Sequence, residues 1–582
     1  MLKSPLGRFT SGIIVLALLL MGCEETTTSD LLLTNGRVYT FAWDEPALDG
    51  TPAANAPFDS TKGWSPNAEA IAIKDREIVF VGSATEAEEY AGSNTRRVNL
   101  KGATVLPGMR DAHVHIGDLG RALTQVNLKD VSSEAEIVEQ VVTRAKETPQ
   151  GRWIVGWGWD EGAFADNYPD KERLSERVPD HPVYLKGLHG FAGLANEMAL
   201  ERAGVTADTE SPQGGTIGRY EDGTPTGIFR NRAVTLITDV IPPPSLDQKK
   251  EQVRTALQEM ARSGYVGVHE AGADSLLVEA FESLARDDHL PIRVYAMLNG
   301  RNEPLIQSWL ERGPETDPSD RLLARSVKFF YDGALGSRGA LLLEDYSDKT
   351  GHRGVGDAEY GFDRDLAAEV MSAGFQVGVH TIGDAANRQT LNFIDSVYAS
   401  NPDARNYRHR LEHAQVIHPD DLSRLGELEL IASMQPPHAV EDKDWAEERL
   451  GSDRMSGAYA WRTLRKNGAD LVFSSDLPGS DHDLFYGLHA AVTRRDKDKQ
   501  PPGGWYSEES LTVEESIRAY STWAAYASFL EEQTGTLQSG RWADLTVVDI
   551  DPMTTQPDNH GRLLEGEIQM TVVEGEIVYS RY

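Results

Sequence analysis

The chain has almost no cysteine: Cys23 is the only one among its 582 residues. A single thiol cannot form a disulfide within the chain, so stabilisation by internal disulfides is excluded. Its position near the N-terminus also leaves the folded part without a thiol nucleophile, which excludes cysteine-dependent catalysis. Any chemistry in this protein must therefore use other side chains.

Positive charge is scarce as well. The 57 Lys and Arg residues stand against 91 Asp and Glu residues, which gives a formal net charge of -34 at pH 7. An acidic surface repels phosphate, so we exclude nucleic acid as a partner. The net charge fits a solvated surface on an exported protein. It does not fix the charge of a substrate, because it says nothing about a pocket.

The chain also lacks an apolar run long enough for a comfortable membrane-spanning helix. The nearest one, Ile13 to Leu20, follows two basic residues and has the build of a signal peptide. It leads into Gly-Cys, which resembles a bacterial lipoprotein cleavage site. We therefore expect a signal peptide over residues 1–22, lipid on Cys23 and a tether over 23–29. Such a protein is exported and anchored at the periplasmic face or the cell surface, with a retained signal anchor as the alternative.

Two histidines on one short apolar run, His113 and His115, are the most informative pair in the sequence. Side chains alternate between faces along a strand, so residues two apart point the same way and two imidazoles can bind one metal ion. Alone the pair is a weak signal in a chain with 15 histidines. It gains weight only from partners elsewhere.

Further metal-ligand candidates stand at or near the ends of later β-like runs. They are Lys328, His380, His413 and Asp476. In a (β/α)8 barrel the chemistry is assembled at the carboxyl ends of separate strands, so residues far apart in sequence meet. Taken singly, Asp476 also fits a turn or helix cap, and Lys328 fits a side chain that extends to the surface. Taken jointly, such interpretations require six unrelated coincidences at strand ends.

Eight short runs match the strands of such a barrel. They are the run ending at His113–His115, then Val266–His269, Ile292–Leu298, Val327–Tyr331, Val377–His380, Arg410–His413, Leu430–Met434 and Leu471–Ser475. Helix-forming segments such as Leu246 to Ser263 separate them. The alternation predicts the α/β class and a (β/α)8 TIM barrel over residues 106–535.

These motifs together resemble the amidohydrolase superfamily, in the branch of the YtcJ-like and N-substituted formamide deformylase-like proteins. The resemblance covers about residues 30–582. The motifs that carry it are Pro107–His115, Asp332–Ala340, His380–Asn387, Glu412–Gln415, Ser433–His438 and Ser475–Pro478. Two positions depart from the pattern. Arg110 replaces an apolar residue, and Lys186 to His189 replaces a variant ending in Asp-Gly-His, which affects the substrate more than the metal site.

The resemblance implies two divalent metal ions and a carbamate formed from carbon dioxide on Lys328. Imidazole-rich ligation without thiolates fits zinc, with manganese, iron and cobalt as alternatives. One ion would be bound by His113, His115 and Asp476, the other by His380 and His413, with Lys328 shared. A lysine aimed into a buried cavity loses part of its preference for the charged form, and its neutral amine can react with carbon dioxide. Asp476 would act as general base toward a metal-bound hydroxide and pass the proton to the leaving nitrogen.

The sequence also predicts the structure of the segments around the barrel. Residues 30–105 and 536–582 are both rich in strands, and the family implies one small β-sandwich domain built from both ends. Residues 127–247 form an insertion after the first barrel strand, which we expect to sit over the metal site as a substrate-shaping cap. The alternative is that its tryptophans, Trp159 among them, only fill the insertion's own core.

The sequence therefore predicts a metal-dependent hydrolase of a carbon–nitrogen bond other than a peptide bond, in an N-substituted amide, a formamide or a cyclic amide. An ester or lactone hydrolase of the same superfamily and a non-catalytic binding lipoprotein are the alternatives. A ring deaminase is less favoured, since those relatives lack the bridging lysine. The sequence leaves open whether the protein forms a homodimer. The candidate substrate contacts are His189, His269, Gln435, His438 and Trp159.

Overall fold

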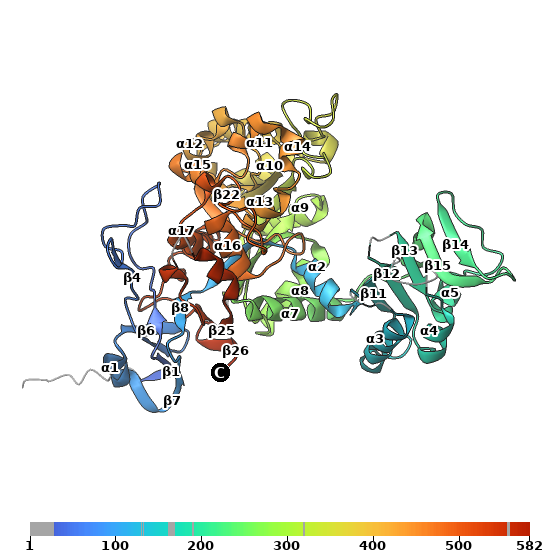
Figure 1. Ribbon diagram of the computed structural model, residues 1–582, viewed down its shortest axis with the longest axis horizontal. Coiled ribbons are helices and arrows are strands. Elements are labelled where there is room, and N and C mark those ends of the chain that lie inside the picture. The colour runs from blue at the N-terminus through green and yellow to red at the C-terminus, as the bar shows by residue number, and fades with distance from the viewer. Residues whose placement is uncertain are drawn as a thin grey trace, which may run out of the picture.

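The computed structural model describes residues 28–129, 131, 133–160, 169–188, 191–317, 320–555 and 559–582. Its centre is a barrel of parallel strands (Figure 1). In order around the barrel the strands are β9 (Met109–Val114), β16 (Tyr265–Ala273), β17 (Arg293–Asn299), β19 (Leu322–Phe330), β20 (Gln376–Thr381), β21 (Arg410–His413), β22 (Ile431–Met434) and β23 (Asp470–Phe473). The predicted barrel is confirmed, strand for strand.

The last strand closes on the first at the carboxyl end of the barrel. The Asp476 amide donates to the His113 carbonyl at 2.9 Å, and the His115 amide donates to the Leu477 carbonyl at 2.8 Å. The strands are buried almost throughout, as parallel strands covered on both faces are. Closure at this end brings the predicted ligands of the first and last strands together.

Helices surround the barrel. They are α2 (Ile116–Thr124), α7 (Leu246–Arg262), α8 (Ser275–Arg286), α9 (Glu303–Arg312), α10 (Arg364–Ser372), α11 (Asp384–Ser400), α12 (Arg424–Glu427), α13 (Pro436–Asp442), α14 (Ala446–Leu450), α15 (Trp461–Lys466), α16 (Leu484–Thr493), α17 (Val513–Tyr520) and α18 (Thr522–Ala527). In α7 a capping box at Ser245 starts the helix, and Val253, Leu257 and Met260 share its buried face. The predicted helical segment Leu246 to Ser263 corresponds to α7.

Strands from both chain ends form two packed sheets beside the amino end of the barrel (Figure 1). One sheet holds β6 (Glu77–Gly82), β5 (Ala70–Lys74), β1 (Ser29–Thr34) and β7 (Ala91–Asn99); the other holds β2 (Arg37–Val38), β8 (Thr104–Pro107), β24 (Leu545–Val548), β25 (Ile568–Val573) and β26 (Glu576–Ser580). Leu33 and Ile71 from one sheet share a core with Val105 and Val547 from the other. The two ends of the chain therefore stabilise one another.

A buried ion network connects these sheets to the barrel. Asp544, just before β24, pairs with Arg110 of β9 at 3.1 Å and with Arg293 of β17 at 3.0 Å. Arg293 also pairs with Glu574 at 2.8 Å. Arg110 departs from the family pattern in the sequence. The structure accommodates an arginine at this position because its side chain pairs with Asp544, a buried carboxylate of the neighbouring domain.

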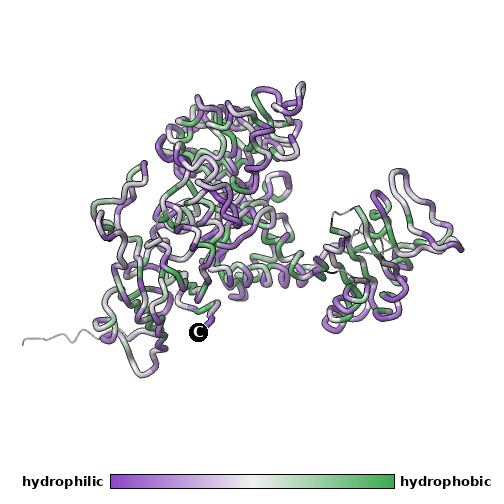
Figure 2. Tube along the Cα trace, in the orientation of Figure 1, coloured by the Kyte–Doolittle hydropathy of each residue, from purple (hydrophilic) through white to green (hydrophobic). Residues whose placement is uncertain are grey.

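The segment between α2 and α7 is a separate α/β lobe beside the barrel (Figure 1). Its sheet runs in the order β10 (Val126–Asn127), β11 (Ile154–Trp159), β12 (Val183–Gly187), β13 (Ala192–Ala195), β15 (Pro225–Asn231) and β14 (Gly215–Arg219); its helices are α3 (Glu134–Glu147), α4 (Glu172–Arg177), α5 (Glu197–Ala203) and α6 (Thr235–Thr238). The lobe has cores of its own, and apolar segments are green in both lobe and barrel in Figure 2. Its action as a substrate-shaping cap stays a prediction.

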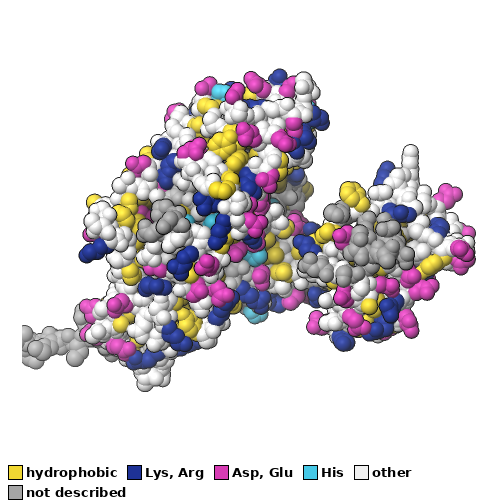
Figure 3. Space-filling model, viewed as in Figure 1, with side chains coloured by type: hydrophobic (Ala, Val, Ile, Leu, Met, Phe, Trp, Pro, Cys, Tyr) yellow, Lys and Arg dark blue, Asp and Glu magenta, His cyan; other side chains and the backbone are white. Residues whose placement is uncertain are grey.

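Acidic side chains are spread over the barrel, the sheets of the chain ends and the lobe on the face shown in Figure 3, in keeping with the strongly negative net charge. Within the described residues no helix combines the length and apolarity that crossing a membrane requires. The predicted signal peptide and Cys23 lie outside the described residues.

Candidate metal centre

The six predicted ligands meet at the carboxyl end of the barrel. They are His113 in β9, His115 directly after it, Lys328 in β19, His380 in β20, His413 in β21 and Asp476 three residues after β23. His113 and His115 share the end of β9, and each of the others stands at or near the end of a different strand, which is why residues far apart in sequence are neighbours here.

Asp476 lies at the middle of this cluster. Its Oδ1 atom is 3.6 Å from His113 Nε2 and 3.4 Å from His115 Nε2. Its Oδ2 atom is 4.0 Å from His413 Nδ1 and 3.7 Å from His438 Nε2. Two groups of potential ligands therefore share one carboxylate, with ligand atoms within 4.8 Å of each other in each group. The geometry fits two adjacent cations.

Lys328 and His380 complete the cluster. The Lys328 Nζ atom is 3.1 Å from His113 Nε2, and the His380 ring centroid is 4.5 Å from that of His413. His380 Nε2 is buried and has no hydrogen-bond partner within the described residues. Because buried polar atoms are normally satisfied, this nitrogen fits a metal ligand. Imidazoles, a carboxylate and no thiolate are a donor set that suits zinc.

Burial favours the neutral amine of the lysine and the neutral imidazoles, which are the forms that bind a cation. It lowers the pKa of Lys328 to about 8, that of His113 to about 4 and that of His380 to about 3. For Asp476 burial acts to raise the pKa, but the hydrogen bond with His115 and the nearby histidines hold it well below its usual value. Neutral imidazoles, an ionised carboxylate and an amine that is easily deprotonated are what cation binding requires.

The orientation of His113 is set by a buried layer beneath the ligands. His113 Nδ1 lies 2.6 Å from Glu412 Oε2, and Arg410 forms a 2.7 Å ion pair with Glu412. The charge of Arg410 outweighs burial and keeps the pKa of Glu412 well below its usual value, so His113 donates from Nδ1. Its Nε2 atom is then free of a proton and faces Asp476. His269, a candidate substrate contact, lies in this layer with Nδ1 2.9 Å from Arg410.

His413 is oriented in the same manner. Its Nδ1 atom is 2.9 Å from Gln435 Oε1, and the Gln435 amide donates to Ser474 Oγ at 2.9 Å. Gln435 is buried, so the structure places this candidate substrate contact behind a ligand. His438, in α13, is the candidate that reaches the cluster, through Asp476.

Two of the six side chains stand on unusual backbone. His413 has φ 71° and Asp476 has φ 58°, in the left-handed region that costs a non-glycine residue of order 1–3 kcal/mol. The closure of β23 on β9 holds Asp476 in this conformation, and the conformation turns its carboxylate toward the histidines.

Two buried carboxylates at this end were not among the predicted site residues. Glu270, near the end of β16, accepts the Ile116 amide at 2.6 Å, and burial raises its pKa to about 7. Asp332 accepts the amides of Ile382 and Gly383 at 3.0 and 2.8 Å, and burial raises its pKa to about 7. Glu270 directly follows His269, and Asp332 begins the Asp-Gly motif. These two positions were the signals in the sequence that could have identified them.

Of the remaining predicted contacts, Trp159 does not meet this cluster. Trp159 is fully buried in the core of the lobe, where its indole N–H donates to the Leu185 carbonyl at 3.0 Å. For Trp159 the structure therefore favours the interpretation that the side chain fills the lobe's core. His189 lies outside the described residues.

Known proteins share both the sequence and the fold. The profile of the Amidohydrolase family matches residues 96–579. An uncharacterized metal-dependent hydrolase from Pyrococcus horikoshii OT3 has a TM-score of 0.68 and 25% identity, over 91% of this chain and 99% of that chain.

Three relatives cover nearly the whole chain. Protein LONG AFTER FAR-RED 3 of Arabidopsis thaliana is 31% identical over 95% of this chain and 92% of its own. Putative amidohydrolase YtcJ of Bacillus subtilis (strain 168) is 31% identical over 88% and 96%. N-substituted formamide deformylase of Arthrobacter pascens is 25% identical over 88% and 95%. The chain therefore belongs to the amidohydrolase family of metal-dependent hydrolases.

Proposed function

We propose that this hydrolase cleaves a carbon–nitrogen bond other than a peptide bond, in an N-substituted amide, a formamide or a cyclic amide. The observation that carries the proposal is the convergence of His113, His115 and His413 on the Asp476 carboxylate, with Lys328 and His380 beside them. The similarity to a protein named N-substituted formamide deformylase supports this bond type.

The cluster supplies the two things that such a hydrolysis needs: ligands for cations and a proton acceptor. Two divalent cations, when bound, would polarise the acyl carbonyl and lower the pKa of water. Asp476 is ionised and touches both ligand groups, so it can accept the proton of the attacking water. The same carboxyl group can then donate that proton to the leaving nitrogen, which departs as a neutral amine.

We propose that Lys328 carries a carbamate that both ions share. Burial brings the pKa of Lys328 to about 8, so a substantial fraction of the amine is neutral near that pH. The neutral amine can add to carbon dioxide, and the product is an anion suited to two cations. Replacing Lys328 with Ala should reduce the bound metal by at least one ion per chain in elemental analysis. Unchanged metal content would refute the shared carbamate.

We also propose that the protein is exported and anchored by lipid on Cys23, which rests on the sequence pattern alone. Cys23→Ser should abolish labelling by a fatty-acid probe in bacterial cells. Labelling that persists in this variant would refute the cleavage site and leave the hydrolase proposal untouched.

The test of the reaction is a substrate panel on metal-loaded protein. N-substituted formamides, secondary amides and cyclic amides are compared with lactones and aryl esters, before and after chelation. We expect turnover of an amide-type substrate that disappears on chelation and returns with zinc. Hydrolysis confined to lactones or esters would overturn the bond assignment, and full activity after verified metal removal would overturn the metal-assisted reaction.

A further inference from the structure

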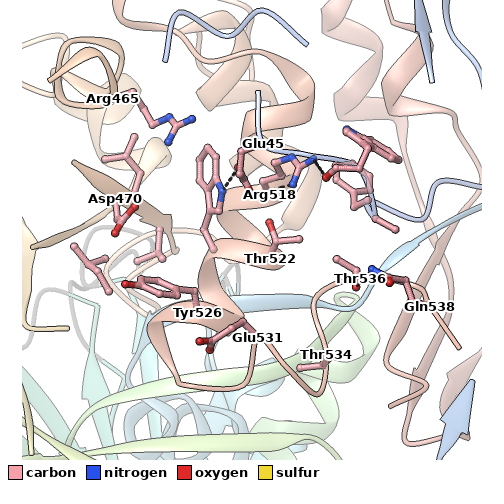
Figure 4. A pocket seen from close by; sticks show the side chains of 17 residues that line it. Glu45, Arg465, Asp470, Arg518, Thr522, Tyr526, Glu531, Thr534, Thr536 and Gln538 are labelled. Carbon is pink, nitrogen blue, oxygen red and sulfur yellow. Dashed lines mark hydrogen bonds and ion pairs between the residues drawn. The ribbon is translucent and has the colours of Figure 1, made fainter. Parts of the chain in front are cut away.

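A cavity lies at the end of the barrel opposite the metal centre. Figure 4 shows the side chains that line it. Its volume is about 530 Å³, and its lining includes Ile431 and Asp470, the first residues of β22 and β23. All barrel strands run in one direction, so these amino ends lie across the barrel from the carboxyl ends that hold the predicted ligands. The cavity is therefore separate from the metal centre.

Aromatic side chains form much of the wall. Phe41 and Trp43 come from the segment after β2, and Trp523 and Tyr526 come from α18. The Phe41 and Trp43 ring centroids are 4.7 Å apart. Flat apolar surfaces of this kind accept a ring, and the volume lies within the range of small-molecule sites.

Most of the charged groups in the wall are already paired. Arg518 pairs with Glu45 at 3.0 Å, and Glu45 also accepts the Trp523 indole N–H at 2.8 Å. Glu531 pairs with Arg408 at 2.5 Å. These side chains shape the cavity, and their charges are compensated within the protein.

Arg465 is different. It is 7% exposed and makes no side-chain hydrogen bond with the part of the chain that the structure describes. The closest carboxylate oxygen, in Glu515, is 3.9 Å from its Nε atom, and that carboxylate already bonds Arg462 at 2.7 Å. The guanidinium lies over the Trp523 ring at 4.4 Å. The Nε atom is buried without a hydrogen-bond partner among the described residues, and buried polar atoms are normally satisfied, so this position favours an anionic group of a ligand.

Asp470 presents the opposite charge to the same cavity. Asp470 is exposed, and its carboxylate makes neither a hydrogen bond nor a close ion pair with described residues, although burial raises its pKa and the charge of Arg465 acts to lower it. Figure 4 shows it on the same side of the cavity as Arg465. Thr522 Oγ1, also in the wall, is buried without a partner. One side of the cavity therefore offers a cation, an anion and a hydroxyl group, none of which has a side-chain hydrogen bond to the described residues.

We propose that this cavity binds a small zwitterionic compound with an aromatic body, of the aromatic amino acid class. Its carboxylate bonds Arg465, its ammonium group pairs with Asp470, and its ring packs against Trp43 and Trp523. The site takes its ligand from the amino end of the barrel and does not depend on the proposed hydrolysis.

The first test compares three probes by titration calorimetry on the full, metal-loaded protein. L-phenylalanine carries both charges, 3-phenylpropionate only the carboxylate and 2-phenylethylamine only the ammonium group. We expect phenylalanine to bind once per chain and each single-charge analogue to bind about tenfold more weakly or worse. No binding of phenylalanine at millimolar concentration, or equal binding of all three, would overturn the proposal.

The second test assigns each charge to its partner. Arg465→Gln should weaken phenylalanine binding about tenfold and leave 2-phenylethylamine unchanged, while Asp470→Asn should weaken phenylalanine and leave 3-phenylpropionate unchanged. Arg562→Gln, in a side chain that is 63% exposed, is the matched control and should change nothing. Arg465 has no hydrogen bond to lose, so its variant should fold, which a thermal melt checks.

A third comparison separates this site from the metal centre. Asp476→Asn should bind phenylalanine as the wild type does, whether or not the wild type hydrolyses any amide tested. Loss of phenylalanine binding in that variant would place the ligand at the carboxyl end of the barrel and refute the second site.

Discussion

Buried carboxylates that have arginine partners and buried carboxylates that lack them behave differently at the two ends of the barrel. At the amino end, Asp544 is fully buried between Arg110 and Arg293, and although burial acts to raise its pKa, the two arginines bring it to about 2. At the carboxyl end, Glu270 and Asp332 are equally buried without an arginine partner, and their pKa values rise to about 7. The Asp544 network at the amino end compensates its charges with protein. At the carboxyl end Glu412 is paired with Arg410, whereas Glu270, Asp332 and the neutral imidazoles are ready for added cations.

This contrast assigns stability to one end and chemistry to the other, as is typical of barrel enzymes. Substitutions at the metal centre should then change turnover or metal content with small effects on folding. Substitutions in the Asp544 network should change folding with small effects on turnover per folded molecule.

The largest expected effect is that of Asp476→Asn. Removing the proton acceptor while keeping an oxygen in place should lower kcat about 10²–10⁴-fold, with metal still bound. Steady-state kinetics with elemental analysis of the same sample would measure both. Asp420→Asn, whose side chain is 83% exposed, is the matched control. Near-normal turnover in the Asp476 variant would refute its role as general base.

Asp544→Asn should be the most destabilising change at the amino end. It leaves Arg110 and Arg293 as buried charges with a weaker partner, and breaking a buried pair in this way costs about 3–5 kcal/mol. Urea denaturation would give the loss in the free energy of unfolding, and kcat per folded molecule should stay within about twofold. An equally large loss of kcat in the folded fraction would erase the distinction between the two ends.

The sequence predicted the barrel in full because each strand is a compact apolar run and each ligand stands at a run's end. What the sequence could not give is the direction of a side chain next to such an end. Gln435 and His269 stand at strand ends like the ligands, yet packing turns them behind His413 and beneath His113. Position along a strand is local information, whereas these orientations depend on residues of neighbouring strands.

The same limit applies to Arg465 and to the lobe. No motif marks Arg465, because its lack of a hydrogen-bond partner is a property of the packed interface between α15 and α18. The insertion lies between α2 and α7, and its position relative to the barrel depends on how these helices leave the wall. Sequence patterns report elements well and contacts between distant elements poorly.

Glu412→Gln tests whether the carboxyl end of the barrel is built to bind cations. Glutamine can keep the hydrogen bond to His113 Nδ1 but not the charge that fixes which nitrogen carries the proton. Loss of such a supporting carboxylate typically weakens metal binding about 10–100-fold. A zinc competition titration with a chelator would measure it, and Glu427→Gln, an exposed change, is the control. Unaltered zinc affinity would mean that Glu412 serves folding alone.

The smallest expected effect is the acid dependence of stability at the amino end. The pKa of Asp544 is about 2 in the folded chain, below the ordinary value of about 3.9, so the folded state favours the ionised form. Its contribution, about 2 kcal/mol, is present above about pH 4 and is lost as the pH falls toward 2. The free energy of unfolding of the wild type should therefore fall more steeply over this range than that of Asp544→Asn. Parallel curves would show that the two arginines do not hold the carboxylate as the geometry indicates, because only an ionised Asp544 can make the wild type depend on protons in this way.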